Sequence, residues 1–212
     1  MKSLPNILTG GRLVLSLAVL GCLAYAGGWI SGAPFGDSTK LQLEAAAFVA
    51  FVVAAVTDFF DGWLARRMGA VSLLGAILDP IADKVLVVAG LFGLLALGAG
   101  YVALPGGLIL FREFSVSAMR EALAPRGLKL PVTLFAKWKT TLQLVALGLL
   151  LFLPLWTATG LPSDVQTLTR AEMLGTALIW FAALITVWTG VEYALAARRA
   201  LEASRPPGSP TP

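Results

Sequence analysis

The chain contains no histidine, a single cysteine and few charged residues. Charged side chains make up 13% of its 212 residues, whereas soluble domains carry about a quarter, and 58% of the residues are hydrophobic. Cys22 cannot form a disulfide within the chain, and the absence of histidine and of clustered cysteine argues against zinc, haem and iron sites. The net charge of +4 is spread over the ends of apolar segments, so we expect no nucleic-acid partner. This composition is typical of an integral membrane protein.

Long apolar stretches recur along the chain, and several reach the roughly 20 residues that a helix needs to cross a bilayer. They span residues 7–30, 42–57, 76–100, 102–124, 133–156 and 173–197. We therefore predict an all-α integral membrane protein with six transmembrane helices. Residues 1–204 form one membrane domain in this interpretation, and the Pro-rich residues 205–212 form a flexible cytoplasmic tail.

The distribution of lysine and arginine predicts the orientation. If the N-terminus is cytoplasmic, the basic residues gather at the cytoplasmic helix ends and leave Lys40 and Arg170 on the other side. Both termini are then cytoplasmic. A cleaved signal peptide is the disfavoured alternative, because Asn6, Thr9 and Arg12 interrupt the first apolar stretch.

Four aspartates stand near the predicted cytoplasmic ends of the second and third helices. Asp58 and Asp61 are three residues apart and Asp79 and Asp83 are four apart, so each pair shares one helical face. An ionised group at membrane depth costs at least ~2.5 kcal/mol. If the two helices pack as antiparallel neighbours, the four carboxylates come together, and protons or cations must neutralise their charge. Oxygen ligands favour Mg²⁺ or Mn²⁺. Substrate phosphates commonly complete the coordination shell of such an ion. The pattern therefore indicates phosphoryl-group chemistry.

Residues between the two aspartate pairs fit an anionic ligand. Gly62 allows close approach to the helix backbone, and Arg66 lies on the same side, where its guanidinium can bind phosphate. Other interpretations stay open. Arg66, Arg67 and Lys84 can instead pair with the aspartates or anchor the helix ends, while Gly62 and Gly75 can serve helix packing.

The whole run is D-x2-D-G-x2-A-R-x8-G-x3-D-x3-D, from Asp58 to Asp83, and it resembles the signature of the CDP-alcohol phosphotransferase family at every fixed position. The resemblance implies a six-helix domain, usually a homodimer, in the inner (plasma) membrane with its active site facing the cytoplasm. It further implies that Mg²⁺ or Mn²⁺ is bound by Asp58, Asp61, Asp79 and Asp83 and that Asp83 deprotonates the attacking alcohol. It assigns the CDP-lipid to Gly62, Arg66 and Ser72, and we add Asn6; for Ser72 and Asn6 helix or loop capping is an equal alternative.

Segments outside the motif extend the resemblance over nearly the whole chain. LPNILTGGRL, DPIADKVLV, FREFSVSAMRE and KWKTTLQ are similar to those of bacterial family members that use CDP-diacylglycerol and glycerol 3-phosphate. The implied products are phosphatidylglycerophosphate and CMP, in phospholipid biosynthesis. Residues 27–40 and the Pro-rich tail depart from the family pattern, away from the expected chemistry.

Glycerol 3-phosphate carries close to two negative charges, so its pocket should contain cations beyond those that serve CDP. The candidates are Arg112, Arg120, Lys137 and Lys139. Alternatively, the arginines pair with the neighbouring glutamates and the lysines anchor a helix at the membrane interface. Inositol phosphate, serine and phosphatidylglycerol remain alternative acceptors. A divalent-cation transporter is disfavoured, because the aspartates lie on only two helices.

Overall fold

The computed structural model describes residues 4–30, 36–68, 73–126 and 135–203, and in these ranges the chain is helical, with short turns and no strand. Side chains are described outside residues 4–6, 59–77, 79, 80, 126, 135–137 and 203. The long helices are α1 (Leu4–Ala26), α2 (Asp37–Met68), α3 (Leu73–Ala96), α4 (Ala103–Leu123), α5 (Phe135–Phe152) and α6 (Val165–Ala203). Short 3-10 helices are η1 (Gly100–Val102), η2 (Ala124–Arg126) and η3 (Leu153–Thr159).

The predicted all-α membrane class is confirmed. Within the described residues, five helices are long and apolar enough to cross a membrane. Their candidate spans are Ile7–Ala26, Asp37–Asp58, Gly100–Leu123, Trp138–Thr159 and Val165–Glu202. The predicted third span falls on α3, a 24-residue helix whose first side chains are outside the described part.

Capping explains why α6 extends beyond its predicted apolar stretch. The Asp164 carboxylate accepts hydrogen bonds from the backbone N–H of Thr167 at 2.9 Å and from its hydroxyl at 2.6 Å, so it caps the helix start. These hydrogen bonds lower the pKa of the Asp164 carboxyl group. At the other end, Arg198 donates to Glu202 one turn later at 2.8 Å, which continues the helix through a charged segment.

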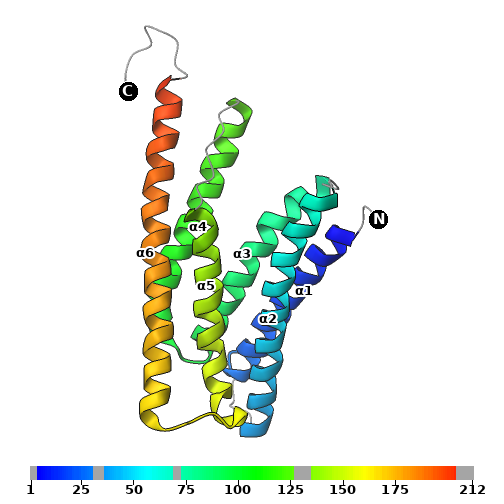
Figure 1. Cartoon of the computed structure of the whole chain (residues 1–212), viewed down its shortest axis with the longest axis vertical. Coiled ribbons are helices and arrows are strands. Elements are labelled where there is room, and N and C mark those ends of the chain that lie inside the picture. The colour runs from blue at the N-terminus through cyan, green and yellow to red at the C-terminus, as the bar shows by residue number, and fades with distance from the viewer. Residues whose placement is uncertain (1–3, 31–35, 69–72, 127–134, 204–212) are drawn as a thin grey trace.

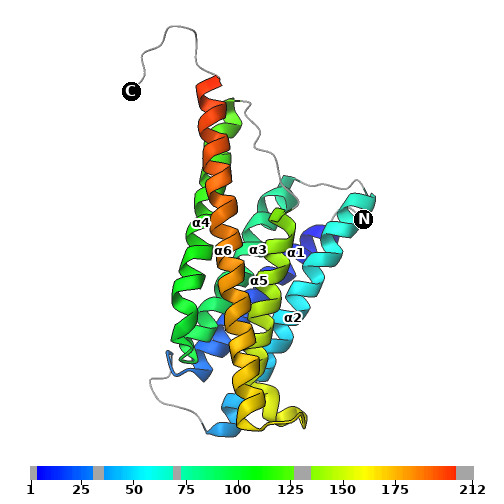
Figure 2. The same ribbon diagram turned by 60° about the vertical axis from the view of Figure 1, so that its left-hand side comes forward.

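The helices form two groups that meet where α2 contacts α5 and where α3 contacts α4 and α5. In one group α1 packs along both α2 and α3; in the other α6 packs along both α4 and α5 (Figures 1 and 2). The start of α1, the end of α2, the start of α3 and the end of α6 all lie toward the upper end of Figure 1. The sequence suggested that α2 and α3 pack face to face, but most of their contacts in this group are with α1. The first helix therefore reaches the carboxylates on both.

Tight helix crossings hold the bundle together. Phe51, Leu147 and Ile179 belong to a continuous buried apolar core. Where the C-terminal ends of α1 and α3 meet, a Cβ atom on Gly27, the residue after α1, would overlap the carbonyl oxygen of Ala96. Small residues permit this close approach, which supplies van der Waals contact where lipid weakens the hydrophobic drive between helices.

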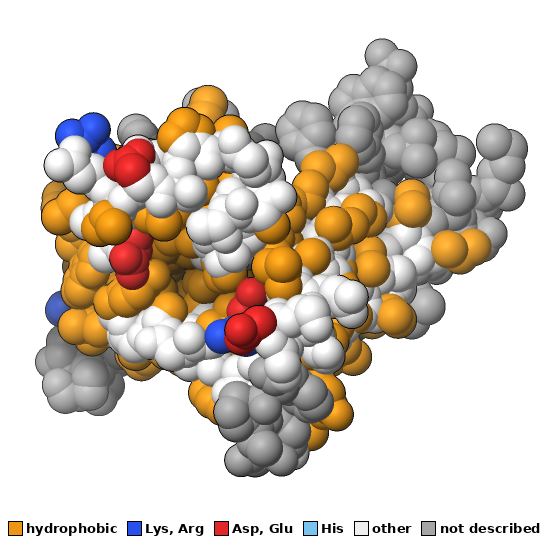
Figure 3. All heavy atoms as spheres, turned by 90° about the horizontal axis from the view of Figure 1, so that it is seen from below, with side chains coloured by type: hydrophobic (Ala, Val, Ile, Leu, Met, Phe, Trp, Pro, Cys, Tyr) orange, Lys and Arg blue, Asp and Glu red, His pale blue; other side chains and the backbone are white. Residues whose placement is uncertain are grey.

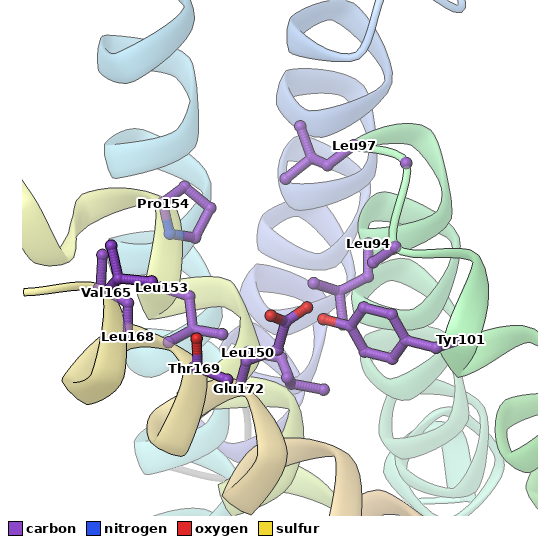
Figure 4. A pocket seen from close by; sticks show the side chains of 12 residues that line it. Leu94, Leu97, Tyr101, Leu150, Leu153, Pro154, Val165, Leu168, Thr169 and Glu172 are labelled. Carbon is purple, nitrogen blue, oxygen red and sulfur yellow. The ribbon is translucent and has the colours of Figure 1, made fainter.

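The lower end of the bundle carries hydrophobic side chains and a few charged ones of both signs (Figure 3). A cavity of about 450 Å³ at this end is lined by residues that include Leu94, Leu150, Tyr101 and Glu172 (Figure 4). Leu94 comes eleven residues after Asp83 on α3, or roughly 16 Å further along the helix at its usual rise. The cavity is therefore separate from the carboxylates described next.

Candidate active site

Arg12 joins carboxylates from two other helices. One of its terminal nitrogens, Nη1, forms an ion pair with Oδ1 of Asp58 on α2 and donates a hydrogen bond to Oδ1 of Asp83 on α3 at 2.5 Å. The Arg12 side chain is 1% exposed, whereas those of Asp58 and Asp83 are 32% and 46% exposed. The cation is thus enclosed while both carboxylates remain accessible from outside.

The first helix presents a buried polar stripe to this point. Thr9, Arg12 and Ser16 are at most 2% exposed, and the Ser16 hydroxyl donates to the Arg12 carbonyl at 2.8 Å. Their spacing of three and four residues places them on one helical face. Sequence reasoning left Arg12 without a role, although a charged residue inside an apolar span was a signal that a buried partner exists.

Several predicted residues fall outside the described side chains. These are Asn6, Asp61, Gly62, Arg66, Ser72, Asp79 and Lys137. In the part of the chain with described side chains, no group of three metal-ligating residues gathers. Of the four predicted metal ligands, Asp58 and Asp83 are the two whose positions can be compared, and they converge on one cationic nitrogen.

A second charged group, here called the cationic cluster, consists of Arg112, Glu113, Arg120, Lys139 and Tyr193. Lys139 on α5 forms an ion pair with Glu113 on α4, and Arg112 lies 3.3 Å from the same carboxylate. Arg120 donates to the Tyr193 hydroxyl on α6 at 2.8 Å. The structure therefore brings together three predicted acceptor residues: Arg112 and Lys139 pair with the Glu113 carboxylate, and Arg120 bonds to Tyr193.

Burial decides between two interpretations of Lys139. The residue is 4% exposed and paired inside the bundle, so it does not serve as a membrane-interface anchor. The alternative of Arg–Glu pairing on α4 holds for Arg112 and Glu113. For Arg120, the hydrogen-bond partner in the structure is Tyr193. Ion pairing within the cluster thus offsets one of its three positive charges.

The two sites meet at consecutive residues of α3. Asp83 contacts Arg12, and the next residue, Lys84, donates to the hydroxyl of Ser117 on α4. The Lys84 ammonium also lies 5.9 Å from the centre of the Phe114 ring. Ser117 follows Glu113 by four residues and precedes Arg120 by three, so it shares their helical face. The carboxylate site therefore borders the cationic cluster.

Sequence reasoning missed the contribution of α6. Thr186 accepts a hydrogen bond from Gln143 at 2.9 Å, and Thr189 accepts one from Arg112 at 3.0 Å. Thr186, Thr189 and Tyr193 are spaced by three and four residues, so they share one face of α6. That spacing was the available signal, since polar side chains in a membrane helix seek partners on neighbouring helices.

Charged side chains held between apolar helices and open on one side define a multispan membrane protein with a polar site of the kind that binds ions or substrates. Comparison with known proteins identifies the family. The model of the CDP-alcohol phosphatidyltransferase family matches residues 2–188. The chain belongs to the CDP-alcohol phosphatidyltransferase family.

Three similar curated proteins share the name CDP-diacylglycerol--glycerol-3-phosphate 3-phosphatidyltransferase. The protein from Cereibacter sphaeroides is 38% identical, over 90% of this chain and 93% of the relative. The protein from Rickettsia typhi is 37% identical, over 91% and 96%. One from Shigella flexneri is 41% identical, over 72% and 79%. The similarity therefore extends over most of each protein.

Proposed function

We propose that the chain transfers the phosphatidyl group of CDP-diacylglycerol to glycerol 3-phosphate, forming phosphatidylglycerophosphate and CMP in phospholipid biosynthesis. Its family and the name shared by its relatives support this assignment. The observation that carries it is the junction on α3, where a carboxylate site for the donor adjoins a cationic cluster for an anionic acceptor. A neutral acceptor would not require such a cluster.

The carboxylates fit a hard divalent cation. The Oδ1 atoms of Asp58 and Asp83 come from different helices and converge on one positively charged nitrogen, so the fold already directs them toward a cation. With Asp61 and Asp79 they would form an all-oxygen ligand set suited to Mg²⁺ or Mn²⁺. When bound, the metal ion neutralises charge on the diphosphate oxygens.

The donor is held by residues of the family motif. Gly62 leaves space beside the helix for the CDP moiety, and Arg66 supplies a guanidinium for its phosphates. Ser72 and Asn6 complete the proposed contacts to the CDP-lipid. The acyl chains remain in the bilayer beside the helices.

The acceptor is bound beside Asp83, where Lys84 of α3 meets Ser117 of α4. Arg112, Arg120 and Lys139 hold its phosphate, together with Lys137. Asp83 takes the proton from the 1-hydroxyl of glycerol 3-phosphate, the hydroxyl oxygen attacks the β-phosphorus, and the bond from this phosphorus to the oxygen of CMP breaks. The 46% exposure of the Asp83 side chain is consistent with access for an alcohol.

The orientation completes the proposal. All six long helices cross the inner (plasma) membrane, both termini are cytoplasmic and the protein is a homodimer. The positions of the basic residues support this orientation. Arg198 and Arg199 lie near the end of α6, at the upper end of Figure 1. Lys40 and Arg170 lie near the starts of α2 and α6, at the lower end. The site then faces the cytoplasm, where glycerol 3-phosphate is dissolved.

An acceptor panel tests the proposed reaction. Purified protein is given CDP-diacylglycerol and Mg²⁺ with glycerol 3-phosphate, inositol phosphate, serine or phosphatidylglycerol, and CMP and lipid product are measured. We expect CMP release with glycerol 3-phosphate and its loss when the metal is chelated. Release with inositol phosphate but not with glycerol 3-phosphate would overturn the acceptor assignment. Metal flux in liposomes without CDP-lipid would favour the transporter instead.

A further inference from the structure

Tyr193 lies between two arginines of the cationic cluster. The guanidinium carbons of Arg112 and Arg120 are 5.3 and 5.0 Å from the centre of its ring. Both distances are within the range of cation–π attraction, and Arg120 also donates to the Tyr193 hydroxyl at 2.8 Å. The two arginines are eight residues apart on α4, which corresponds to about 12 Å along the helix axis. Their side chains therefore turn toward each other to share one ring.

The α6 backbone adds to the placement of Arg112. A Cβ atom on Gly190 would lie 2.7 Å from Cγ of Arg112, so the glycine gives the arginine stem space against the helix. The Thr189 hydroxyl donates to the Thr186 carbonyl at 3.0 Å and accepts from Nη2 of Arg112 at the same distance. Arg112 is thus held in place by Thr189, Gly190 and Tyr193 of α6.

The guanidinium of Arg112 is not fully satisfied by these contacts. Its Nε atom is buried and has no hydrogen-bond partner among the described residues. Two positive groups near one ring also repel each other, and a dianionic phosphate relieves that repulsion. The arrangement favours an anion that both arginines contact.

We propose that Tyr193 is a positioning residue for the acceptor: by holding Arg112 and Arg120 at one ring, it arranges both guanidinium groups for the phosphate of glycerol 3-phosphate. This inference rests on the proposed function. Fixing two flexible side chains before the substrate arrives lowers the ordering cost of binding. Tyr193 thereby acts on acceptor affinity through the arginines and not on the CDP-lipid.

Two substitutions separate the hydroxyl from the ring. Tyr193→Phe removes the hydrogen bond from Arg120 and keeps the ring, whereas Tyr193→Leu removes both. We expect the KM for glycerol 3-phosphate to rise about three- to tenfold in Tyr193→Phe and more than about tenfold in Tyr193→Leu. The KM for CDP-diacylglycerol and kcat should stay within about twofold of wild type, because the lost interaction concerns acceptor binding.

Tyr101→Phe is the matched control, because Tyr101 faces Glu172 in the cavity at the other end of the bundle (Figure 4). It should change neither KM. Binding is also measured directly: glycerol 3-phosphate is titrated into the protein in detergent, and the unfolding temperature is recorded. The quantity compared is the concentration that gives half of the maximal increase in this temperature. This concentration should rise in the same order as the KM, and Tyr193→Phe serves as the test if Tyr193→Leu does not fold.

The outcomes distinguish this inference from the proposed function. If wild-type protein releases CMP with glycerol 3-phosphate and both Tyr193 variants keep the wild-type KM for it, the positioning role is wrong. Equal increases in both KM values, or a fall in kcat alone, also overturn that role. If wild-type protein neither binds glycerol 3-phosphate nor releases CMP with it, the proposed function itself fails.

Discussion

Replacing Arg12 should destabilise the protein most strongly when no divalent cation is present. In Arg12→Met the side chain keeps an unbranched stem but loses the positive charge between Asp58 and Asp83. The two carboxylates then face each other without their described counter-ion. A divalent cation can replace the lost charge, so added Mg²⁺ should stabilise this variant more than it stabilises wild type.

The magnitude follows from the exposure of the three side chains. Removing one partner of a fully buried ion pair costs about 3–5 kcal/mol, whereas an exposed pair contributes about 0.2–1 kcal/mol. Arg12 is 1% exposed, but the two carboxylates are 32% and 46% exposed and are partly solvated. We therefore expect a loss of about 1–3 kcal/mol in the free energy of unfolding without metal.

Thermal unfolding in detergent, with chelator and with Mg²⁺, measures both parts of this prediction. Arg198→Met is the matched control, because Arg198 and its partner Glu202 are 76% and 54% exposed. That variant should lose at most about 0.5 kcal/mol, independently of Mg²⁺. The reasoning about Arg12 is refuted if Arg12→Met is as stable as wild type in chelator, or if Mg²⁺ raises the unfolding temperature of both proteins equally.

Further predictions concern the base, a helix crossing and a helix cap. Asp83→Asn should lower CMP release by at least about 100-fold while the protein still folds, as judged by size-exclusion chromatography, and retained release would show that Asp83 is not the base. Gly27→Ala should lower the unfolding temperature, because its Cβ would overlap the Ala96 carbonyl oxygen. Gly21→Ala is the control: its Cβ would meet nothing within 4 Å, so this variant should be neutral or slightly stabilising. Equal effects of the two substitutions would contradict the close contact between Gly27 and Ala96. Asp164→Ala should destabilise the protein at neutral pH by removing the α6 cap. Since the folded-state pKa of Asp164 is lowered from 3.8, the advantage of wild type over this variant should be complete above that value and disappear as the pH falls through the lowered pKa. A difference that does not depend on pH would exclude the carboxylate as its source.

The helices could be predicted from the sequence because long apolar runs leave few alternatives in a membrane. The carboxylate site could be predicted in part. The spacing of Asp58 and Asp83 within the motif indicated a shared site, and the structure brings both to Arg12. The role of Arg12 could not be derived, because it depends on α1 packing along both α2 and α3, and hydropathy carries no information on which helices are neighbours.

The cationic cluster shows the same limit. Arg112, Arg120 and Lys139 stood out as charges in or beside apolar stretches, so their common location could be anticipated from charge alone. Tyr193 could not, because an aromatic residue in a membrane helix ordinarily faces lipid or the core. Its importance depends on the two guanidinium groups that pack on its ring. Which polar residues belong to a site depends on which helices pack together, even when these helices are far apart in the sequence.

The division of the bundle has a consequence for acceptor choice. Arg12, Asp58 and Asp83 come from α1, α2 and α3, whereas the cationic cluster comes from α4, α5 and α6. Among the described side chains, the neighbouring residues Asp83 and Lys84 connect the two, through Arg12 and Ser117. Substitutions in the cluster can therefore alter the recognition of the acceptor while the carboxylates keep their positions. In the proposed reaction, acceptor specificity and the chemistry of the CDP-lipid are separable properties that meet at one turn of α3.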